Sequence, residues 1–328
     1  MTGLSDSFQR PIDYLRISVT DRCDFRCIYC MPPDGICPLA HDDILSYEEI
    51  RVIVQAAAEL GIKKVRLTGG EPLVRLGLAQ LIEMLAQIEA IDDISLTTNG
   101  TLLGRYAAEL KQAGLRRVNV SLDTLKPDRF KDITRSSYDL NDVLKSMEIA
   151  RTVGLNPVKI NMVVLAGIND DELLDFARRT IDEEWHVRFI ELMLSAGAGT
   201  SASQFVSVSE MRKRLETLGE LEPCSPGVGN GPAKYFCLPH AKGTIGFITP
   251  ISEHFCIHCN RLRLTADGKL RLCLLSDEEI DLRQPLRSGI SPAGLKRLIE
   301  EAVARKPLRH SLVEGHRPRG RPMTHIGG

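Results

Sequence analysis

Six of the nine cysteines in the chain fall into two triplets that lie far apart in the sequence. The triplets are Cys23, Cys27 and Cys30, and Cys256, Cys259 and Cys273. Cysteine thiolates are the ligands of iron–sulfur clusters, and a four-iron cluster held by only three of them leaves one iron open to a small chelating substrate. An odd number of cysteines in a chain of 328 residues does not indicate a disulfide framework. The two triplets therefore predict two metal sites.

The first triplet lies in a loop directly after a predicted β-strand at residues 14–20. Its cysteines are separated by three and then two residues, and the aromatic Tyr29 precedes the last of them. A three-cysteine zinc site and plain buried cysteines are the alternatives. Structural zinc sites usually have a fourth ligand nearby and shorter paired spacings. The spacing therefore favours an iron–sulfur cluster with an open iron.

The second triplet has a wider spacing, and on spacing alone a zinc ribbon with His258 or His254 as its fourth ligand is equally compatible. Arg261 and Arg263 lie just after Cys259 and point the same way if that segment is extended. Arginine suits bidentate binding of phosphate. We therefore expect an anionic substrate beside the second site, and the alternative is a solvent-exposed basic strand.

Apolar, β-branched segments alternate with helical ones through the first two-thirds of the chain. Strands are expected at residues 14–20, 64–68, 94–98, 118–122, 158–164 and 187–192. This alternation predicts an α/β fold with a parallel sheet or barrel. A helix near residues 173–181 has Asn169 as its expected cap.

Polar or glycine-rich sequences follow several of these strands. They occupy residues 69–72, 97–100, 121–123 and 191–193. Any one of them alone would be an ordinary turn. Parallel α/β folds place their active sites at the carboxyl ends of the strands, so we expect these segments to line one site.

The pattern changes after residue 194. A Gly/Ala/Ser loop at residues 195–203 and a Pro/Gly-rich stretch at 224–232 predict a boundary between domains at residues 1–205 and 206–328. Short strands are expected beyond it, with a hairpin at Asp267 and Gly268. One further helix is expected behind a Ser291 cap, with Pro292 at its first position.

The composition is that of a globular protein, with 43% apolar and 26% charged residues. The net charge of −1 argues against a nucleic-acid-coating protein, so we expect no nucleic-acid partner. No apolar run is long enough to span a membrane and no signal peptide is evident, so we expect a cytoplasmic protein without membrane contact. The three remaining cysteines, Cys37, Cys224 and Cys237, are expected to be plain thiols.

Several of these segments carry a family resemblance. The first triplet, read as Cys-Asp-Phe-Arg-Cys-Ile-Tyr-Cys, resembles the cysteine signature of the radical S-adenosylmethionine (SAM) superfamily, and residues 69–72 resemble its second signature. Over nearly its full length the chain resembles the GTP 3′,8-cyclase family of molybdenum cofactor biosynthesis. Residues 66–72, 97–100, 260–263 and 326–328 carry this closer resemblance, together with the second triplet.

The resemblance implies an incomplete (β/α)6 radical SAM barrel with a C-terminal, cluster-bearing extension that closes its open side. It implies a lyase that converts GTP to (8S)-3′,8-cyclo-7,8-dihydroguanosine 5′-triphosphate. The implied cofactors are two [4Fe–4S] clusters, one on each cysteine triplet, and S-adenosylmethionine.

The resemblance also implies roles for individual residues. S-adenosylmethionine would be lined by Tyr29, Gly70, Ser121 and Met193. GTP would be held by Arg16, Arg66, Thr97, Lys159, Arg188, Arg261, Leu262 and Arg263, of which Arg16, Arg261 and Arg263 would also be catalytic. A Gly327–Gly328 tail would enter the active site near Arg16.

The implied partners are the substrate GTP, an electron donor and a downstream enzyme that forms a pyranopterin, and the resemblance allows a homodimer. Two rival functions stay open on the sequence. One is another radical SAM enzyme with an auxiliary cluster, such as a peptide-modifying enzyme, and the other is a zinc-binding interaction protein.

Overall fold

A computed structural model describes residues 3–193, 200–225, 227, 231–310 and 321–327. Its strands form one sheet in the order β12-β11-β10-β1-β2-β3-β4-β5-β6-β9-β8-β7. The first six strands are β1 (Tyr14–Ser18), β2 (Lys64–Thr68), β3 (Asp93–Thr98), β4 (Arg117–Ser121), β5 (Lys159–Val164) and β6 (His186–Glu191). The others are β7 (Glu222–Pro223), β8 (Lys234–Cys237), β9 (Thr244–Ile248), β10 (Arg261–Leu264), β11 (Lys269–Arg271) and β12 (Glu279–Asp281). The fold is thus α/β with a mixed sheet, and the six strands predicted from the sequence are confirmed.

The two faces of the six parallel strands differ in chemistry because successive side chains point to opposite sides. One face is apolar and at most 1% exposed, with Leu15, Ile17, Val65, Leu67, Leu96, Val118, Val120, Ile160, Met162, Val187 and Phe189. The other face carries Arg16, Arg66, Ser95, Thr97, Arg117, Asn119, Ser121, Lys159, Asn161 and Arg188. Parallel sheets usually bury apolar side chains on both faces. A polar face therefore indicates a ligand site.

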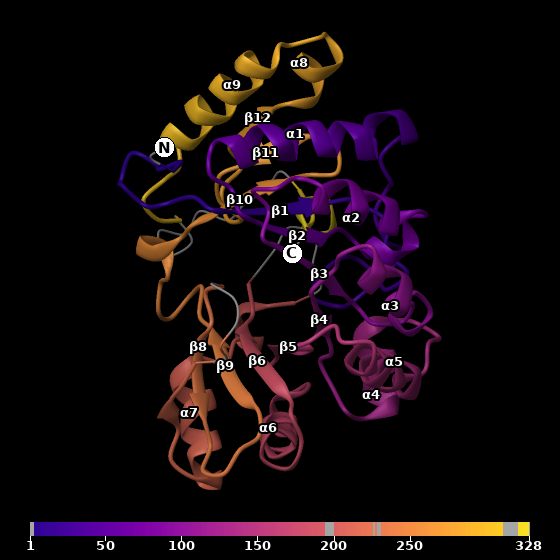
Figure 1. Cartoon of the computed structure of the whole chain (residues 1–328). Coiled ribbons are helices and arrows are strands. Elements are labelled where there is room, and N and C mark those ends of the chain that lie inside the picture. Colours follow the sequence, from indigo (N-terminus) through magenta and orange to yellow (C-terminus); the bar gives the residue numbers. More distant parts are fainter. Residues whose placement is uncertain (1–2, 194–199, 226, 228–230, 311–320, 328) are drawn as a thin grey trace.

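Helices cover the apolar face along the outside of the curved sheet (Figure 1). They are α1 (Tyr47–Glu59), α2 (Leu78–Ala86), α3 (Leu103–Gln112), α4 (Pro127–Thr134), α5 (Leu140–Thr152) and α6 (Leu173–Asp182). Local signals fix their ends, as at α1, where the Ser46 hydroxyl and the Glu49 carboxylate form a reciprocal capping box. None of the helices in the described part of the chain is long and apolar enough to cross a membrane.

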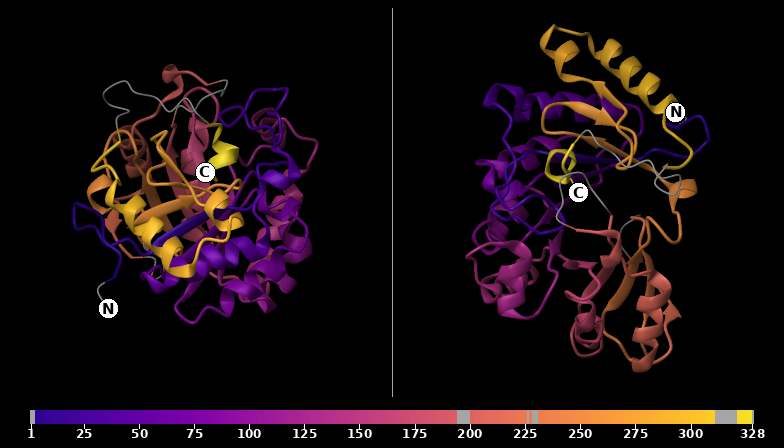
Figure 2. Two further views of the ribbon diagram at one scale, coloured as in Figure 1. Left: turned by 90° about the horizontal axis from the view of Figure 1, so that it is seen from above. Right: turned by 180° about the vertical axis from the view of Figure 1, so that it is seen from behind.

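The C-terminal third joins the same sheet at both of its ends. Strand β9 pairs in parallel with β6, and β10 pairs in parallel with β1. This region also contains α7 (Val208–Leu215), α8 (Arg283–Arg287), α9 (Pro292–Ala304) and α10 (Met323–Ile326). The last of these lies inside the curve of the sheet, beside β1 (Figure 2). The chain's last turn is thereby brought to the polar face.

Most local predictions in this region are confirmed. Strands β10 and β11 form the expected hairpin, and Ser291 caps α9 through the amide of Gly294. Asn169 precedes the 3-10 turn Asp170–Glu172 that leads into α6, as expected, but its side chain makes no capping hydrogen bond. Its amide oxygen accepts from the backbone N–H of Leu165, and its amide nitrogen donates to the carbonyl of Asp123 at 2.8 Å. This side chain is used to fix a strand end and not a helix end.

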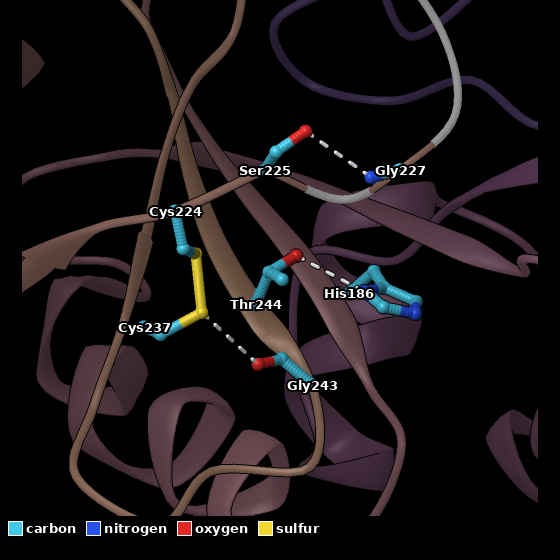
Figure 3. The surroundings of a disulfide bond; sticks show 7 residues. All are labelled: His186, Cys224, Ser225, Gly227, Cys237, Gly243 and Thr244. Atoms are coloured by element: carbon cyan, nitrogen blue, oxygen red, sulfur yellow. Dashed lines mark hydrogen bonds between the residues drawn. A yellow bond between two sulfur atoms is a disulfide. The ribbon is translucent and has the colours of Figure 1, made fainter.

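The prediction that Cys224 and Cys237 are plain thiols is also wrong. The two form a disulfide that links the ends of the antiparallel strands β7 and β8 (Figure 3). Cys37 is a free, exposed thiol, as expected. The disulfide was missed because spacing in the sequence does not reveal which residues two paired strands bring close together.

Candidate active site

A cavity lies at the carboxyl ends of the strands, around the first cysteine triplet. Its lining includes Cys23, Cys27, Tyr29, Cys30, Gly70, Thr97, Ser121 and Met193. All four residues predicted to line S-adenosylmethionine are therefore brought together. Met323 and Thr324 of α10 complete one side of the cavity. The C-terminal turn thus forms part of the wall.

Gly70 lets the second signature pack directly against the cysteine loop. A Cβ atom at this position would lie 2.3 Å from the carbonyl oxygen of Arg22, a separation that no real side chain tolerates. The amide of Gly70 donates to the carbonyl of Thr20 at 2.8 Å. Glycine is needed here because two backbone segments approach so closely.

Glu71 is buried at the base of the cavity and is held by three donors. It accepts from the hydroxyl of Thr98 at 2.8 Å and from the backbone N–H groups of Asn99 at 2.7 Å and Leu73 at 3.0 Å. Burial raises the pKa of the Glu71 carboxyl to about 7, although these hydrogen bonds act in the opposite direction. These three hydrogen bonds fix the orientation of the Glu71 carboxyl, so that it can accept a hydrogen bond from the amino group of a ligand.

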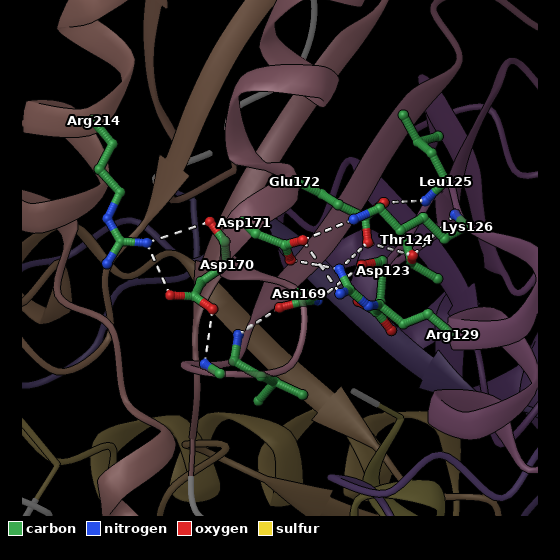
Figure 4. A network of polar contacts seen from close by, with 12 residues as sticks. Asp123, Thr124, Leu125, Lys126, Arg129, Asn169, Asp170, Asp171, Glu172 and Arg214 are labelled. Carbon is green, nitrogen blue, oxygen red and sulfur yellow. Dashed lines mark hydrogen bonds and ion pairs between the residues drawn. The ribbon is translucent and has the colours of Figure 1, made fainter.

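Asp123 provides a second buried carboxylate on the same edge. It accepts from the hydroxyl of Tyr29 at 2.7 Å and from the backbone N–H of Val163 at 2.8 Å. Burial raises its pKa to about 6. Asn169 and Glu172 anchor the loop after β4 from behind, through hydrogen bonds to Asp123 and to the residues that follow it (Figure 4). Tyr29 is thereby tied to a rigid support.

The first triplet fits a cluster by the chemistry of its donors. Burial raises the pKa of Cys23 and Cys27 well above the usual range and that of Cys30 to about 12, so these thiols are protonated when no metal is bound. Metal binding requires their deprotonation and compensates the buried negative charge. No three Cys, His, Asp or Glu side chains in the described ranges are arranged to hold a single metal ion.

The second triplet lies beside β10, on a short turn at Cys256–His258 and on the segment that follows β11. Burial acts to raise the pKa of Cys259, but the positive charges of Arg261 and Lys306 outweigh it and lower this pKa to about 7. A thiolate is therefore accessible here near neutral pH. His254 is a candidate zinc ligand, but its Nδ1 atom lies 3.2 Å from the carbonyl oxygen of Pro250.

Two buried cations that the sequence analysis missed support the second triplet. Arg10 donates to the carbonyl of Cys256 at 2.7 Å and to Asp6 at 2.6 Å. Lys306 donates to the carbonyl of Arg261 at 2.9 Å and also to that of Leu272. No local pattern identifies these residues, because each one contacts a segment more than thirty positions away.

A cluster of cationic side chains occupies the polar face between the two triplets. Arg66 donates to the hydroxyl of Ser95 at 3.1 Å, and Arg188 donates to the amide oxygen of Asn119 at 2.5 Å. Lys159 is 1% exposed and lies 3.3 Å from the hydroxyl of Tyr235. Burial and the charge of Arg188 lower the pKa of Lys159 to about 7. Cations packed this closely on neutral partners suit an anionic ligand.

Strand β10 adds its arginines to this cluster. Arg261 lies level with Tyr14, and Arg263 lies level with Arg16 of β1. Burial, and after it the charges of Arg263 and Arg66, lower the pKa of Arg16 well below its usual range. The side chain of Leu262 is 1% exposed, on the apolar face, so only its backbone can contribute to a site.

The C-terminal tail reaches the cluster as predicted up to Gly327. The Gly327 carbonyl accepts from Nη1 of Arg263 at 2.7 Å. A Cβ atom here would lie 2.2 Å from the hydroxyl of Thr68, so a glycine is required. Gly328 lies outside the described residues.

Comparison with known proteins gives two family matches. The radical SAM superfamily matches residues 17–180, and the family described as Molybdenum Cofactor Synthesis C matches residues 185–312. Among solved structures, SuiB of Streptococcus suis superposes with a TM-score of 0.63 at 13% identity, covering 93% of this chain and 68% of SuiB. That likeness shows a shared fold.

Close relatives cover nearly the whole chain. The GTP 3′,8-cyclase of Desulforamulus reducens is 52% identical over 98% of this chain and 99% of its own length. That of Pelotomaculum thermopropionicum is 51% identical over 99% of this chain and 100% of its own length. On this evidence, the chain belongs to the GTP 3′,8-cyclase family of the radical SAM superfamily.

Proposed function

We propose that this protein converts GTP to (8S)-3′,8-cyclo-7,8-dihydroguanosine 5′-triphosphate, an early step of molybdenum cofactor biosynthesis. S-adenosylmethionine is the radical source. The observation that carries the proposal is the division of one polar sheet face into two parts. A cavity with buried carboxylates borders the first cysteine triplet, and a cationic cluster lies between it and the second triplet. The two parts suit a cationic and an anionic ligand, respectively.

S-adenosylmethionine occupies the cavity at the carboxyl edge in this proposal. Tyr29, Gly70, Ser121 and Met193 line it, and Glu71 accepts from the methionyl amino group. The sulfonium charge is matched by Asp123 and Glu71, which are both buried. Met323 and Thr324 of α10 line one side of the cavity, where they would help to shield a reactive radical from water.

Two [4Fe–4S] clusters are proposed, one on each cysteine triplet. Cys23, Cys27 and Cys30 would hold the first, which would supply the electron that cleaves S-adenosylmethionine. Cys256, Cys259 and Cys273 would hold the second, which would offer guanine a binding site. The protein's own task is orientation, charge compensation and exclusion of water. Arg10 and Lys306 fit this task at the second triplet, since they fix the carbonyls of the cysteine-bearing segments.

GTP lies across the cationic cluster. Arg16, Arg66, Lys159 and Arg188 hold its phosphates and ribose, while Arg261 and Arg263 position it beside the second cluster. Thr97 and the backbone of Leu262 add polar contacts. Charge-assisted hydrogen bonds from arginine to phosphate are short and strong, and here they form in a buried site. Arg16, Arg261 and Arg263 are the residues proposed to act in catalysis.

The division of the fold follows from this arrangement. We propose that residues 1–205 form the incomplete (β/α)6 barrel, and that residues 206–328 form an extension that closes its open side and carries the second cluster. The pairing of β9 with β6 and of β10 with β1 supports this division. An electron donor and a pyranopterin-forming enzyme are the proposed partners, and a homodimer is compatible with the proposal.

Anaerobic incubation tests the function directly. The protein is reconstituted with iron and sulfide and mixed with GTP, S-adenosylmethionine and dithionite. We expect 5′-deoxyadenosine and a guanosine-derived product with the same mass as GTP, because one electron and one proton replace the hydrogen atom that C3′ loses. We also expect about eight irons per chain, as two four-iron clusters require. Formation of 5′-deoxyadenosine without loss of GTP would contradict the proposal.

A further inference from the structure

One buried cation joins two of the three segments that carry the second cysteine triplet. Lys306 lies shortly after the end of α9 and is 3% exposed. Its ammonium donates to the carbonyl of Arg261 at 2.9 Å, near Cys259 in the chain. It also donates to the carbonyl of Leu272, the residue directly before Cys273. A further hydrogen bond joins this ammonium to the thiol of Cys259. The charge of Lys306 is therefore in contact with the sulfur ligands of the second site.

The neighbouring cation, Arg10, differs from Lys306 because its charge is compensated. Arg10 donates to the carbonyls of Cys256 and Pro307, each at 2.7 Å, and so fixes the remaining cysteine segment beside Lys306. Asp6 accepts from Nε of Arg10 at 2.6 Å, and both side chains of this ion pair are buried. Within the described ranges no carboxylate pairs with Lys306, whose partners are carbonyls and a thiol. Lys306 thus acts on the site as a charge, whereas Arg10 mainly fixes its backbone.

The first triplet lies among charges of the opposite sign. Apart from the cysteines themselves, the charged groups that act on its thiols are carboxyl groups, those of Asp24, Glu71 and Asp123. The cations Arg261 and Lys306 are the corresponding groups at the second triplet. Reduction adds one negative charge to a cluster, so a nearby cation stabilises the reduced form and a nearby carboxylate destabilises it. The surroundings of the two triplets therefore favour different reduction potentials.

We propose that the charge of Lys306 raises the reduction potential of the second cluster, so that the second cluster is more easily reduced than the first. The external reductant supplies the one electron involved, and no bond is made or broken. Arg261 adds to the effect, since its Nη2 atom lies 4.0 Å from the sulfur of Cys259. Phosphate of bound GTP would compensate the charge of Arg261, whereas Lys306 is held between protein groups and keeps its effect. The inference rests on the proposed function, because it requires a cluster on each triplet.

The test is an anaerobic redox titration of the reconstituted protein, followed by electron paramagnetic resonance. Wild type, Lys306→Gln and the control Lys296→Gln are compared. Glutamine keeps N–H donors for the two carbonyls but lacks the charge. Lys296 lies on α9 and is paired with Glu59 at the surface, so its charge is removed far from the sulfur ligands. Signals are assigned with Cys27→Ser, which should retain only the second cluster.

The wild-type protein should show two midpoint potentials, with the higher one on the second cluster. Lys306→Gln should lower this midpoint by at least about 59 mV, which corresponds to a tenfold change in the equilibrium constant of a one-electron couple. The midpoint of the first cluster and the iron content should stay at wild-type values. Lys306→Arg, which keeps the charge, should retain the wild-type midpoint, and Lys296→Gln should behave as wild type.

Several results would overturn the inference while leaving the proposed function intact. One is a wild-type protein whose second cluster has the lower midpoint, and this result is informative even if Lys306→Gln does not retain the second cluster. Another is an unchanged midpoint in Lys306→Gln, or an equal fall of both midpoints. An equal fall in Lys306→Arg and Lys306→Gln would assign the effect to packing and not to charge. Wild-type protein with only about four irons per chain would instead contradict the proposed function.

Discussion

The carboxyl edge and the interior of the polar sheet face carry opposite charge. Buried carboxylates of Glu71, Asp123 and Glu191 lie at the edge, whereas Arg66 and Arg188 lie in the interior. Both regions belong to the same strands, separated by a few residues. The proposed function uses this difference in charge, since it assigns the sulfonium of S-adenosylmethionine to the edge and the triphosphate of GTP to the interior.

The two regions also differ in how they are stabilised without ligands. Each edge carboxylate accepts several protein hydrogen bonds, as Glu191 does from the backbone N–H groups of Val208, Ile251 and Ser252, each at 3.0 Å. In the interior, Arg117 pairs with Asp93, whereas Arg66 and Arg188 donate to the neutral side chains of Ser95 and Asn119. Burial and like charge lower the pKa of Arg66 to about 10. The edge is thus pre-organised by the protein, and the interior gains most of its stabilisation from its ligand.

The largest effect is predicted for a substitution that removes a ligand of the first cluster. Cys27→Ser should abolish formation of 5′-deoxyadenosine, because each thiolate is one of only three protein ligands of the first cluster. Iron analysis should show loss of that cluster alone. Cys37→Ser, at the exposed free thiol, is the matched control and should be fully active. Retained cleavage of S-adenosylmethionine in Cys27→Ser, with the second cluster intact, would refute the assignment.

A deletion of Gly327 and Gly328 tests the point where the two regions meet. Gly327 contacts Arg263 in the interior, while the neighbouring turn α10 lines the edge cavity. Cyclisation should fall strongly, whereas iron content and unfolding temperature should stay at wild-type values because the tail adds little to the core. Wild-type turnover in the truncated enzyme would show that the tail has no role in the reaction.

Arg263→Ala should affect the interior alone. Loss of a hydrogen bond to a charged group costs about 1.5–3 kcal/mol, which corresponds to GTP binding weakened about ten- to a hundredfold. Binding of S-adenosylmethionine should remain near normal. Both affinities are measured by calorimetry, with the exposed Arg297→Ala as control. Equal losses for both ligands would mean that the regions are not independent.

The smallest predicted effect is a pH dependence of GTP binding. Lys159 has a pKa of about 7 because of burial and the charges of Arg188 and Arg117, and phosphate favours its charged form. The contribution of the Lys159 charge to GTP affinity is complete below the pKa that Lys159 has in the free protein. This contribution is lost as pH rises toward the higher pKa that Lys159 has in the complex with GTP. Affinity should therefore fall up to about tenfold per pH unit above about pH 7. Lys159→Met should remove this dependence. An unchanged slope in that variant would exclude Lys159 as its source.

Sequence patterns predicted the features that local chemistry determines. The cysteine triplets, the six strands and the Ser291 cap are readable because spacing and periodicity act over a few residues. Tertiary contacts were not readable. Arg10 meets Cys256 across 246 positions, Cys224 meets Cys237 only through strand pairing, and Asn169 binds a neighbouring strand end in place of a helix.

Hydrogen transfer between the two ligands is the most direct test of the account. The reconstituted enzyme is incubated without oxygen with S-adenosylmethionine, dithionite and GTP that carries deuterium at C3′. If the edge holds S-adenosylmethionine and the interior holds GTP with its ribose toward the edge, mass analysis will find the deuterium in 5′-deoxyadenosine. Deuterium retained entirely in the guanosine-derived product would contradict this arrangement.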